Sequence, residues 1–262
     1  MDKLDCMRFA GKVNQEAIEL GFDIAKGMML GEIDAAIEQY ILDHNCRPAF
    51  KNYQPPGAKS PFPATACLSP NSVVVHGIPN DYFVEPGDLL TIDLGVEYNG
   101  WFVDSARSRV IAYDGSTNHR KAQDLIDATE AILNAQLSVL KDECTFLEVV
   151  EVSEAMARNH NVVILPQWGG HKIGDKVHID PFIPNAIDTN LSNLQQQLER
   201  KKYARMTFKE GDTICLEPVV SYGNTAIIVD ADLWTIRKAD GNLAAHTERC
   251  VLVTKTGYEI LS

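Results

Sequence analysis

The sequence predicts an α+β fold in which an antiparallel sheet is flanked by helices. Two helix–helix–strand cycles follow one another along the 262 residues, and each contains one similar carboxylate-bearing strand motif. With 45% hydrophobic residues, the chain has ample apolar side chains for a sizeable core. No low-complexity stretch or linker interrupts it, so we expect residues 1–262 to form a single domain.

The first cycle begins with two predicted helices. Apolar residues recur at helical spacing through residues 7–26 and again from Glu32 onward. Residues 46–64 are rich in Pro, Gly and Lys and are expected to form a loop. Strand-like stretches follow at 64–69, 73–75, 88–96 and 101–111.

The second cycle repeats this order. Residues 117–140 and 146–160 have the spacing of apolar residues that is typical of helices. Strand-like stretches are found at 162–165, 212–220, 225–229 and 246–254.

A short motif links the two cycles. Residues 87–93 read Gly-Asp-Leu-Leu-Thr-Ile-Asp, and residues 211–217 read Gly-Asp-Thr-Ile-Cys-Leu-Glu. Because strand side chains alternate between faces, Asp93 and Glu217 should point away from the apolar face. A duplicated unit would place these carboxylates around a pseudo-twofold axis, although chance or simple turn chemistry also explains so short a repeat.

Charge and cysteine usage restrict the class of protein. A net charge of −12 argues against general binding to nucleic acid or anionic membranes. The polar N-terminus lacks the apolar region of a signal peptide, and no apolar run is long enough to span a membrane. The six cysteines are far apart without a CxxC pair, so we expect reduced thiols and a cytoplasmic location.

Four acidic residues lie within apolar, strand-like surroundings. A carboxylate buried there is costly unless it is paired or bound to a metal. Any one of them is more commonly a strand-end or salt-bridged residue, but the group indicates a metal site when histidines in glycine-rich turns accompany it. The acidic residues are Asp93, Asp104, Glu217 and Glu248.

Three histidines lie in such turns, namely His76, His171 and His178. For the remaining four, a hydrogen-bonded structural role is expected. These are His44, His119, His160 and His246. Carboxylate-rich sites with one imidazole suit Mn, Fe, Co or Zn, and a shared carboxylate can bridge two ions.

The order and spacing of these motifs resemble the methionine aminopeptidases of peptidase family M24, whose pita-bread fold is shared with Xaa-Pro peptidases. The resemblance covers nearly the whole chain. Its most specific parts are Val75-His76-Gly77-Ile78-Pro79, the Asp93-to-Asp104 spacing, Gly170-His171, His178 with Pro181, Leu216-Glu217-Pro218, and Glu248.

The resemblance implies a cofactor of two divalent ions, of cobalt, manganese, iron or zinc. Asp93 is expected to chelate one ion, while Asp104 and Glu248 bridge both. His171 and Glu217 are expected to bind the other ion.

The resemblance also assigns roles around the scissile peptide bond. Glu217 would move the proton, and His76 and His178 would hydrogen-bond the peptide and its developing charge. The methionine side chain would lie against Phe62, Cys67 and Trp234, for which ordinary core packing is the alternative.

Spacing points to the type I enzymes of bacterial type. Glu217 and Glu248 are only 31 positions apart, which leaves no room for the type II insertion, and no N-terminal zinc-binding extension precedes the catalytic part. The expected activity is removal of the initiator methionine from nascent proteins with a small second residue, by a monomer. The alternatives are an Xaa-Pro aminopeptidase of the same fold and a non-catalytic ribosome- or RNA-associated relative.

The chain departs from the family pattern in four places. Lys172 replaces a usual glycine, Val177 replaces a usual phenylalanine, and the loop at 50–62 lacks the usual Tyr-His-Gly-Tyr-Pro-like stretch. The segment 186–208 is long for the family, and four of the seven residues at 199–205 are basic. This run is either a solvated helix end or a docking patch for ribosomal RNA.

Overall fold

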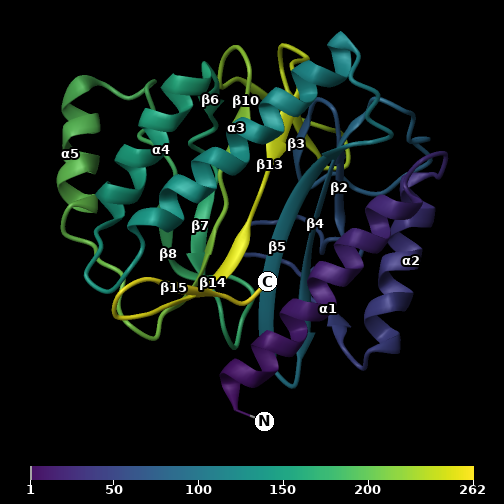
Figure 1. Ribbon diagram of the computed structural model, residues 1–262, viewed down its shortest axis with the longest axis horizontal. Coiled ribbons are helices and arrows are strands. Elements are labelled where there is room, and N and C mark those ends of the chain that lie inside the picture. The colour runs from purple at the N-terminus through teal and green to yellow at the C-terminus, as the bar shows by residue number, and fades with distance from the viewer. Residues whose placement is uncertain (1) are drawn as a thin grey trace.

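The computed structural model describes residues 2–262. Figure 1 shows α1 and α2 beside one half of the strands, α3 and α4 beside the other half, and α5 at the outer edge. The helices are α1 (Lys3–Ile24), α2 (Leu30–Asp43), α3 (Thr117–Val139), α4 (Phe146–His160) and α5 (Asn193–Tyr203). Over residues 2–262 we find no helix long and apolar enough for a membrane span.

The strands form four sheets among the described residues, and every pairing in them is antiparallel. The first contains β1 (Arg47–Pro48), β2 (Cys67–Pro70), β4 (Leu89–Tyr98) and β5 (Trp101–Val110). The second contains β7 (Gly169–Lys172), β8 (Ile179–Pro184), β9 (Thr213–Leu216), β14 (Arg249–Val253) and β15 (Tyr258–Ile260).

The two smaller sheets complete the arrangement. One orders β13 (Ala244–His246), β10 (Val219–Ser221) and β6 (Val163–Ile164). The other orders β11 (Ile227–Val229), β12 (Ile236–Lys238) and β3 (Val73–Val75). Helices with antiparallel sheets confirm the predicted α+β class.

All four predicted helices of the two cycles are present. The first begins four residues earlier than expected, because the Asp2 side chain accepts a hydrogen bond from the backbone N–H of Asp5 and caps it. The fourth begins after Thr145, which forms a capping box with Glu148. Local polar side chains, rather than apolar spacing, therefore set these boundaries.

The internal duplication is visible in the turns that precede the two motifs. Gly87 and Gly211 both have positive φ angles, of 98° and 90°. Their N–H groups donate to the equivalent carbonyls of Ile111 and Val253, at 2.8 and 2.9 Å. The two turns have the same conformation and equivalent hydrogen-bond partners. They therefore relate the two halves of the chain, as the pseudo-twofold hypothesis requires.

Two predicted strands are wrong in extent. The stretch 212–220 is divided into β9 and β10 at Glu217 and Pro218, because proline has no N–H to continue the ladder. The stretch 246–254 is likewise divided between β13 and β14, and Glu248 lies between them. The short strands at 169–172, 179–184, 236–238 and 258–260 were not predicted at all.

The end of the chain packs against the first helix. Leu261 is buried in the main hydrophobic cluster together with residues of α1. An alanine Cβ at Gly11 would lie 1.7 Å from the carbonyl oxygen of Leu261. The Ser262 hydroxyl donates to the Asp104 carbonyl at 2.9 Å, so this contact reaches the strand that carries Asp104.

Replacing Gly11 with alanine should lower the free energy of unfolding by about 1–3 kcal/mol, the usual cost of overpacking a filled core. Urea denaturation measures the change. Gly31→Ala in α2 is the matched control. Its Cβ would meet no atom closer than the Asn80 carbonyl oxygen, at 3.7 Å. Equal stability of the two variants would contradict the close packing of Gly11.

Candidate metal centre and adjoining pocket

The first half of the chain contributes two aspartates from neighbouring strands. Asp93 lies on β4 opposite Ala106, and Asp104 lies on β5 opposite Gly95. The two aspartates are therefore diagonal neighbours on one face of the ladder. They are buried, with only 8% and 2% of their surface exposed.

The second half contributes an imidazole and two glutamates. His171 lies on β7, Glu217 follows β9, and Glu248 precedes β14. The Nε2 atom of His171 lies 3.6 Å from Glu217 Oε1 and 3.8 Å from Glu248 Oε1. These separations are too long for hydrogen bonds.

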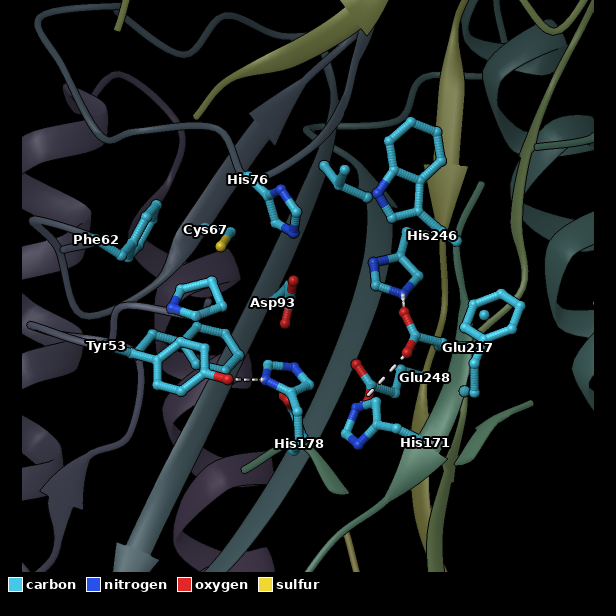
Figure 2. A pocket seen from close by; sticks show the side chains of 18 of the residues that line it. Tyr53, Phe62, Cys67, His76, Asp93, His171, His178, Glu217, His246 and Glu248 are labelled. Carbon is cyan, nitrogen blue, oxygen red and sulfur yellow. Dashed lines mark hydrogen bonds and ion pairs between the residues drawn. The ribbon is translucent and has the colours of Figure 1, made fainter. Parts of the chain in front are cut away.

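The two halves meet at Glu248. Its N–H donates to the Ala106 carbonyl on β5 at 2.9 Å. Candidate ligand atoms of Asp93, Asp104 and Glu248 lie within 4.8 Å of one another. Figure 2 shows Asp93 facing Glu217, Glu248 and His171 across this space, so all five residues expected to bind metal converge.

The polar atoms at this point lack partners. Among the described side chains, those of residues 2–116 and 119–262, seven buried polar atoms have no hydrogen-bond partner, and five of them belong to this cluster. They are Asp93 Oδ1, Asp104 Oδ1, His171 Nε2, His246 Nε2 and Glu248 Oε1. Buried polar groups are normally paired, and oxygen and nitrogen donors that converge in this way suit divalent ions of the first transition row.

Burial also shifts the acidity of these groups. It raises the pKa of Glu217 and Glu248 well above the usual range, with further repulsion from Asp104. Burial raises the pKa of Asp104 to about 7, and it lowers the pKa of His171 to about 4. The low-dielectric site thus disfavours every charged form. A bound cation would compensate for the charge of the carboxylates, and the neutral imidazole is the form that binds metal.

An apolar pocket adjoins the cluster in a cavity of about 570 Å³. All three predicted pocket residues line it, and Phe62 and Trp234 meet edge to face with ring centroids 5.3 Å apart. Phe62 and Cys67 are buried together with Val177 and Phe50. The valine at 177 therefore contributes to an aromatic-lined cluster on the side of the cavity.

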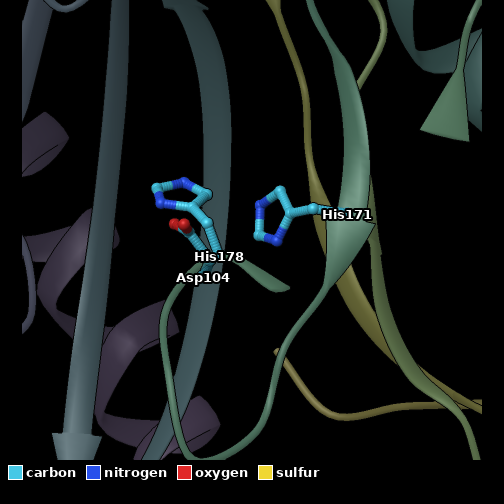
Figure 3. A group of neighbouring side chains, drawn as sticks. All are labelled: Asp104, His171 and His178. Carbon is cyan, nitrogen blue, oxygen red and sulfur yellow. The ribbon is translucent and has the colours of Figure 1, made fainter. Parts of the chain in front are cut away.

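The two histidines expected to contact the peptide lie at opposite sides of the cluster (Figure 2). His76 directly follows β3 with a φ of 56°, and burial lowers its pKa to about 4. The His178 ring lies 4.5 Å from that of His171, beside Asp104 (Figure 3). The Tyr53 hydroxyl lies 3.0 Å from His178 Nδ1, which fixes the ring and leaves Nε2 directed elsewhere.

Lys172 does not disturb the centre. Strand alternation directs it away from the side that His171 faces, and its Nζ atom donates to Asp212 Oδ1 at 2.7 Å. Among the described residues, those with positive φ do not include Lys172. The glycine usual in the family is therefore not required here for backbone conformation.

Sequence reasoning missed two residues of the site. His246 was expected to be a hydrogen-bonded structural histidine, but its buried Nε2 atom has no partner and lies 3.6 Å from Glu217 Oε2. Tyr53 belongs to a loop whose sequence departs from the family pattern. For His246 the available signal was its position two residues before Glu248.

The model of Metallopeptidase family M24 matches residues 5–255. The methionine aminopeptidase of Mycoplasma capricolum is 31% identical over 262 residues, which are 100% of this chain and 96% of that protein. The crystal structure of methionine aminopeptidase from Rickettsia prowazekii is similar, with a TM-score of 0.84 and 29% identity, covering 97% of this chain and 94% of that one.

Prolidase from Pyrococcus furiosus has a TM-score of 0.71 at 19% identity. The match covers 99% of this chain but only 63% of the prolidase chain. At this identity the likeness concerns the fold alone, and it agrees with the expected pita-bread architecture.

Relative to the Asp104→Asn variant, the metal-free protein should lose stability as the pH rises from about 4 to about 7, while the buried histidines, whose pKa is lowered, act in the opposite direction in both proteins. The pKa of Asp104 is raised from 3.8 to about 7 in the folded state, so the folded state binds more protons in this window and loses that advantage above it. Thermal unfolding with a chelator present measures the slope. Asp104→Asn cannot titrate at this position. If stability changed with pH in the same way in this variant as in wild type, the assignment would be contradicted.

Proposed function

The chain belongs to metallopeptidase family M24, and we propose that it is a methionine aminopeptidase that removes the initiator methionine from nascent proteins with a small second residue. One observation carries this proposal. Five buried polar atoms without partners converge beside an apolar pocket, and the chain matches methionine aminopeptidases over almost their full length.

We propose Asp93, Asp104, His171, Glu217 and Glu248 as the ligands of two divalent ions. Such ions, when bound, supply an activated water and polarise the carbonyl of the substrate. The donor set is compatible with Co, Mn, Fe or Zn. Because four of these donors are buried and the side chain of Glu217 is only 13% exposed, the protein holds them in place before any substrate arrives.

The side chains around the centre would handle the proton and the peptide. Glu217 is 13% exposed at its side chain and lines the cavity, so it reaches both the centre and the substrate. It would take the proton from the attacking water and deliver it to the leaving amine. His76 and His178 would hydrogen-bond the scissile peptide from opposite sides of the cavity.

The apolar wall gives a reason for methionine selectivity. Phe62, Cys67 and Trp234 form a pocket of aromatic and sulfur-bearing side chains. A thioether makes favourable contacts with aromatic rings, and the unbranched methionine side chain adapts to such a space. The alternative, simple core packing, is less well supported because all three residues line the cavity.

The alternatives are less well supported. An X-Pro aminopeptidase from Thermotoga maritima shares the fold, but the match covers only 60% of that chain. A non-catalytic relative would have no need of five converging donors. We therefore retain both only as outcomes of the activity test.

We further propose that residues 1–262 act as one catalytic domain and as a monomer in the cytoplasm. The proposed ligands extend from Asp93 to Glu248, so both halves of a single chain complete the site. All six cysteines are buried and unpaired. Free thiols throughout suit a reducing compartment.

We also propose that residues 199–205 dock on ribosomal RNA. They comprise the end of α5 and the two residues after it, at the outer edge of the molecule (Figure 1). Arg200 is engaged by Glu154 at 2.6 Å. Lys201, Lys202 and Arg205 are exposed, and Lys202 pairs with Glu199 at 3.3 Å. Three exposed cations on one edge of an acidic protein provide a local attraction to phosphate.

The purified protein loaded with Mn²⁺, Fe²⁺ or Co²⁺ should cleave Met-Gly-Met-Met and leave an Ala-Pro peptide intact, as chromatography of the products will show. The matched variant Asp104→Ala should lose at least about 100-fold in activity together with bound metal, since it removes a central charged donor. Preferential cleavage of the Ala-Pro peptide would indicate the Xaa-Pro alternative. No cleavage of either peptide would indicate the non-catalytic ribosome- or RNA-associated alternative.

Charge reversal of Lys201, Lys202 and Arg205 to glutamate should reduce co-sedimentation with ribosomes, most clearly at low salt. Reversal of Lys12, Lys26 and Lys141, three exposed lysines elsewhere, serves as the control for net charge. Activity on the tetrapeptide should be unaffected in both. Equal sedimentation of all variants would eliminate the docking patch.

A further inference from the structure

The centre contains a second buried imidazole that the expected ligand set does not include. His246 is the last residue of β13 and is only 2% exposed. Within residues 2–262 its Nε2 atom finds no hydrogen-bond partner. Leaving a buried polar atom unsatisfied is unfavourable, so this nitrogen points to a ligand. Figure 2 shows its ring facing Glu217.

The separations around Glu217 are those expected between ligands of the same metal ion. His246 Nε2 lies 3.6 Å from Glu217 Oε2, and His171 Nε2 lies 3.6 Å from Glu217 Oε1. Hydrogen bonds would be shorter. Two donor atoms that bind the same ion, each at 2.0–2.2 Å, lie roughly 3–3.6 Å apart. The two imidazoles are therefore placed alike on either side of one carboxylate.

The internal duplication gives independent support. In the first half, Asp104 is paired with the residue two positions after Asp93. In the second half, His246 is paired with the residue two positions after Glu217. His246 thus occupies the ladder position that corresponds to Asp104, a proposed ligand, and should face the centre for the same reason.

The backbone of His246 is held firmly. Its N–H donates to the Ser108 hydroxyl at 3.0 Å, and its carbonyl accepts from the same hydroxyl at 2.9 Å. Ser108 lies on β5, the strand that carries Asp104. The imidazole is therefore attached to the same rigid strand system as the other donors, which favours a preorganised ligand.

We propose that His246 Nε2 directly binds the ion held by Glu217 and Glu248, which makes this a two-histidine metal centre. Candidate ligand atoms of the three residues lie within 4.8 Å of one another. The inference rests on the proposed metallopeptidase function. An added imidazole should strengthen binding of Co, Zn and Fe more than binding of Mn, since imidazole suits the former ions.

X-ray absorption of the full-length protein loaded with two equivalents of Co²⁺ tests this ligand count. Wild type should show about one imidazole per ion on average, and His246→Gln about half as many. Calorimetric titration with Co²⁺ should show at least about 10-fold weaker binding of one ion in the variant. His44→Gln is the control, since His44 is hydrogen-bonded to the Tyr40 carbonyl in α2, away from the centre.

Several outcomes would overturn the inference. An equal imidazole count in wild type and His246→Gln would overturn it, even if the affinity for Co²⁺ falls. His246 would then act only by positioning Glu217. If the variant does not fold, a wild-type average of about half an imidazole per ion decides against it. Loaded wild type that shows the two-histidine spectrum but cannot cleave Met-Gly-Met-Met would contradict the proposed function and leave this inference intact.

Discussion

The convergence of several carboxylates and imidazoles in one buried space is the constraint on which the structure depends. Burial raises the pKa of the acids, mutual repulsion adds to this, and several polar atoms have no partner. A folded protein tolerates such a cluster only when protons or cations neutralise it. The surrounding strands bring these unpaired ionisable groups together in one cluster, beside a cavity that can hold a ligand.

The internal duplication explains how the chain builds this point from distant segments. Equivalent turns at Gly87 and Gly211 begin equivalent strands, and each half delivers donors to the face between them. The second half departs from strict repetition at Pro218, where the ladder is interrupted. That interruption leaves Glu217 between two short strands, with its two oxygens toward different imidazoles.

Much of this could be predicted from sequence because it depends on local patterns. Apolar spacing identified the helices, and acids embedded in apolar strands identified Asp93 and Asp104. The strand break before Glu248 was missed because it depends on tertiary pairing, which apolar runs do not reveal. The break at Pro218 has a local signal in the proline itself, which the surrounding apolar run concealed. His246 was missed for a related reason. A lone histidine in an apolar stretch looks structural until the register of its partner strand is known.

Part of the apolar pocket comes from a different kind of structure than the donor cluster, although Cys67 lies on β2, opposite Asp93. The donors are attached to paired strands or to their ends, whereas Tyr53 and Phe62 come from the connection between β1 and β2. Connecting segments tolerate replacement and changes in length far better than paired strands do. In this architecture, side-chain preference can therefore diverge between related proteins through changes in this connection, while the machinery that breaks the bond is inherited unaltered.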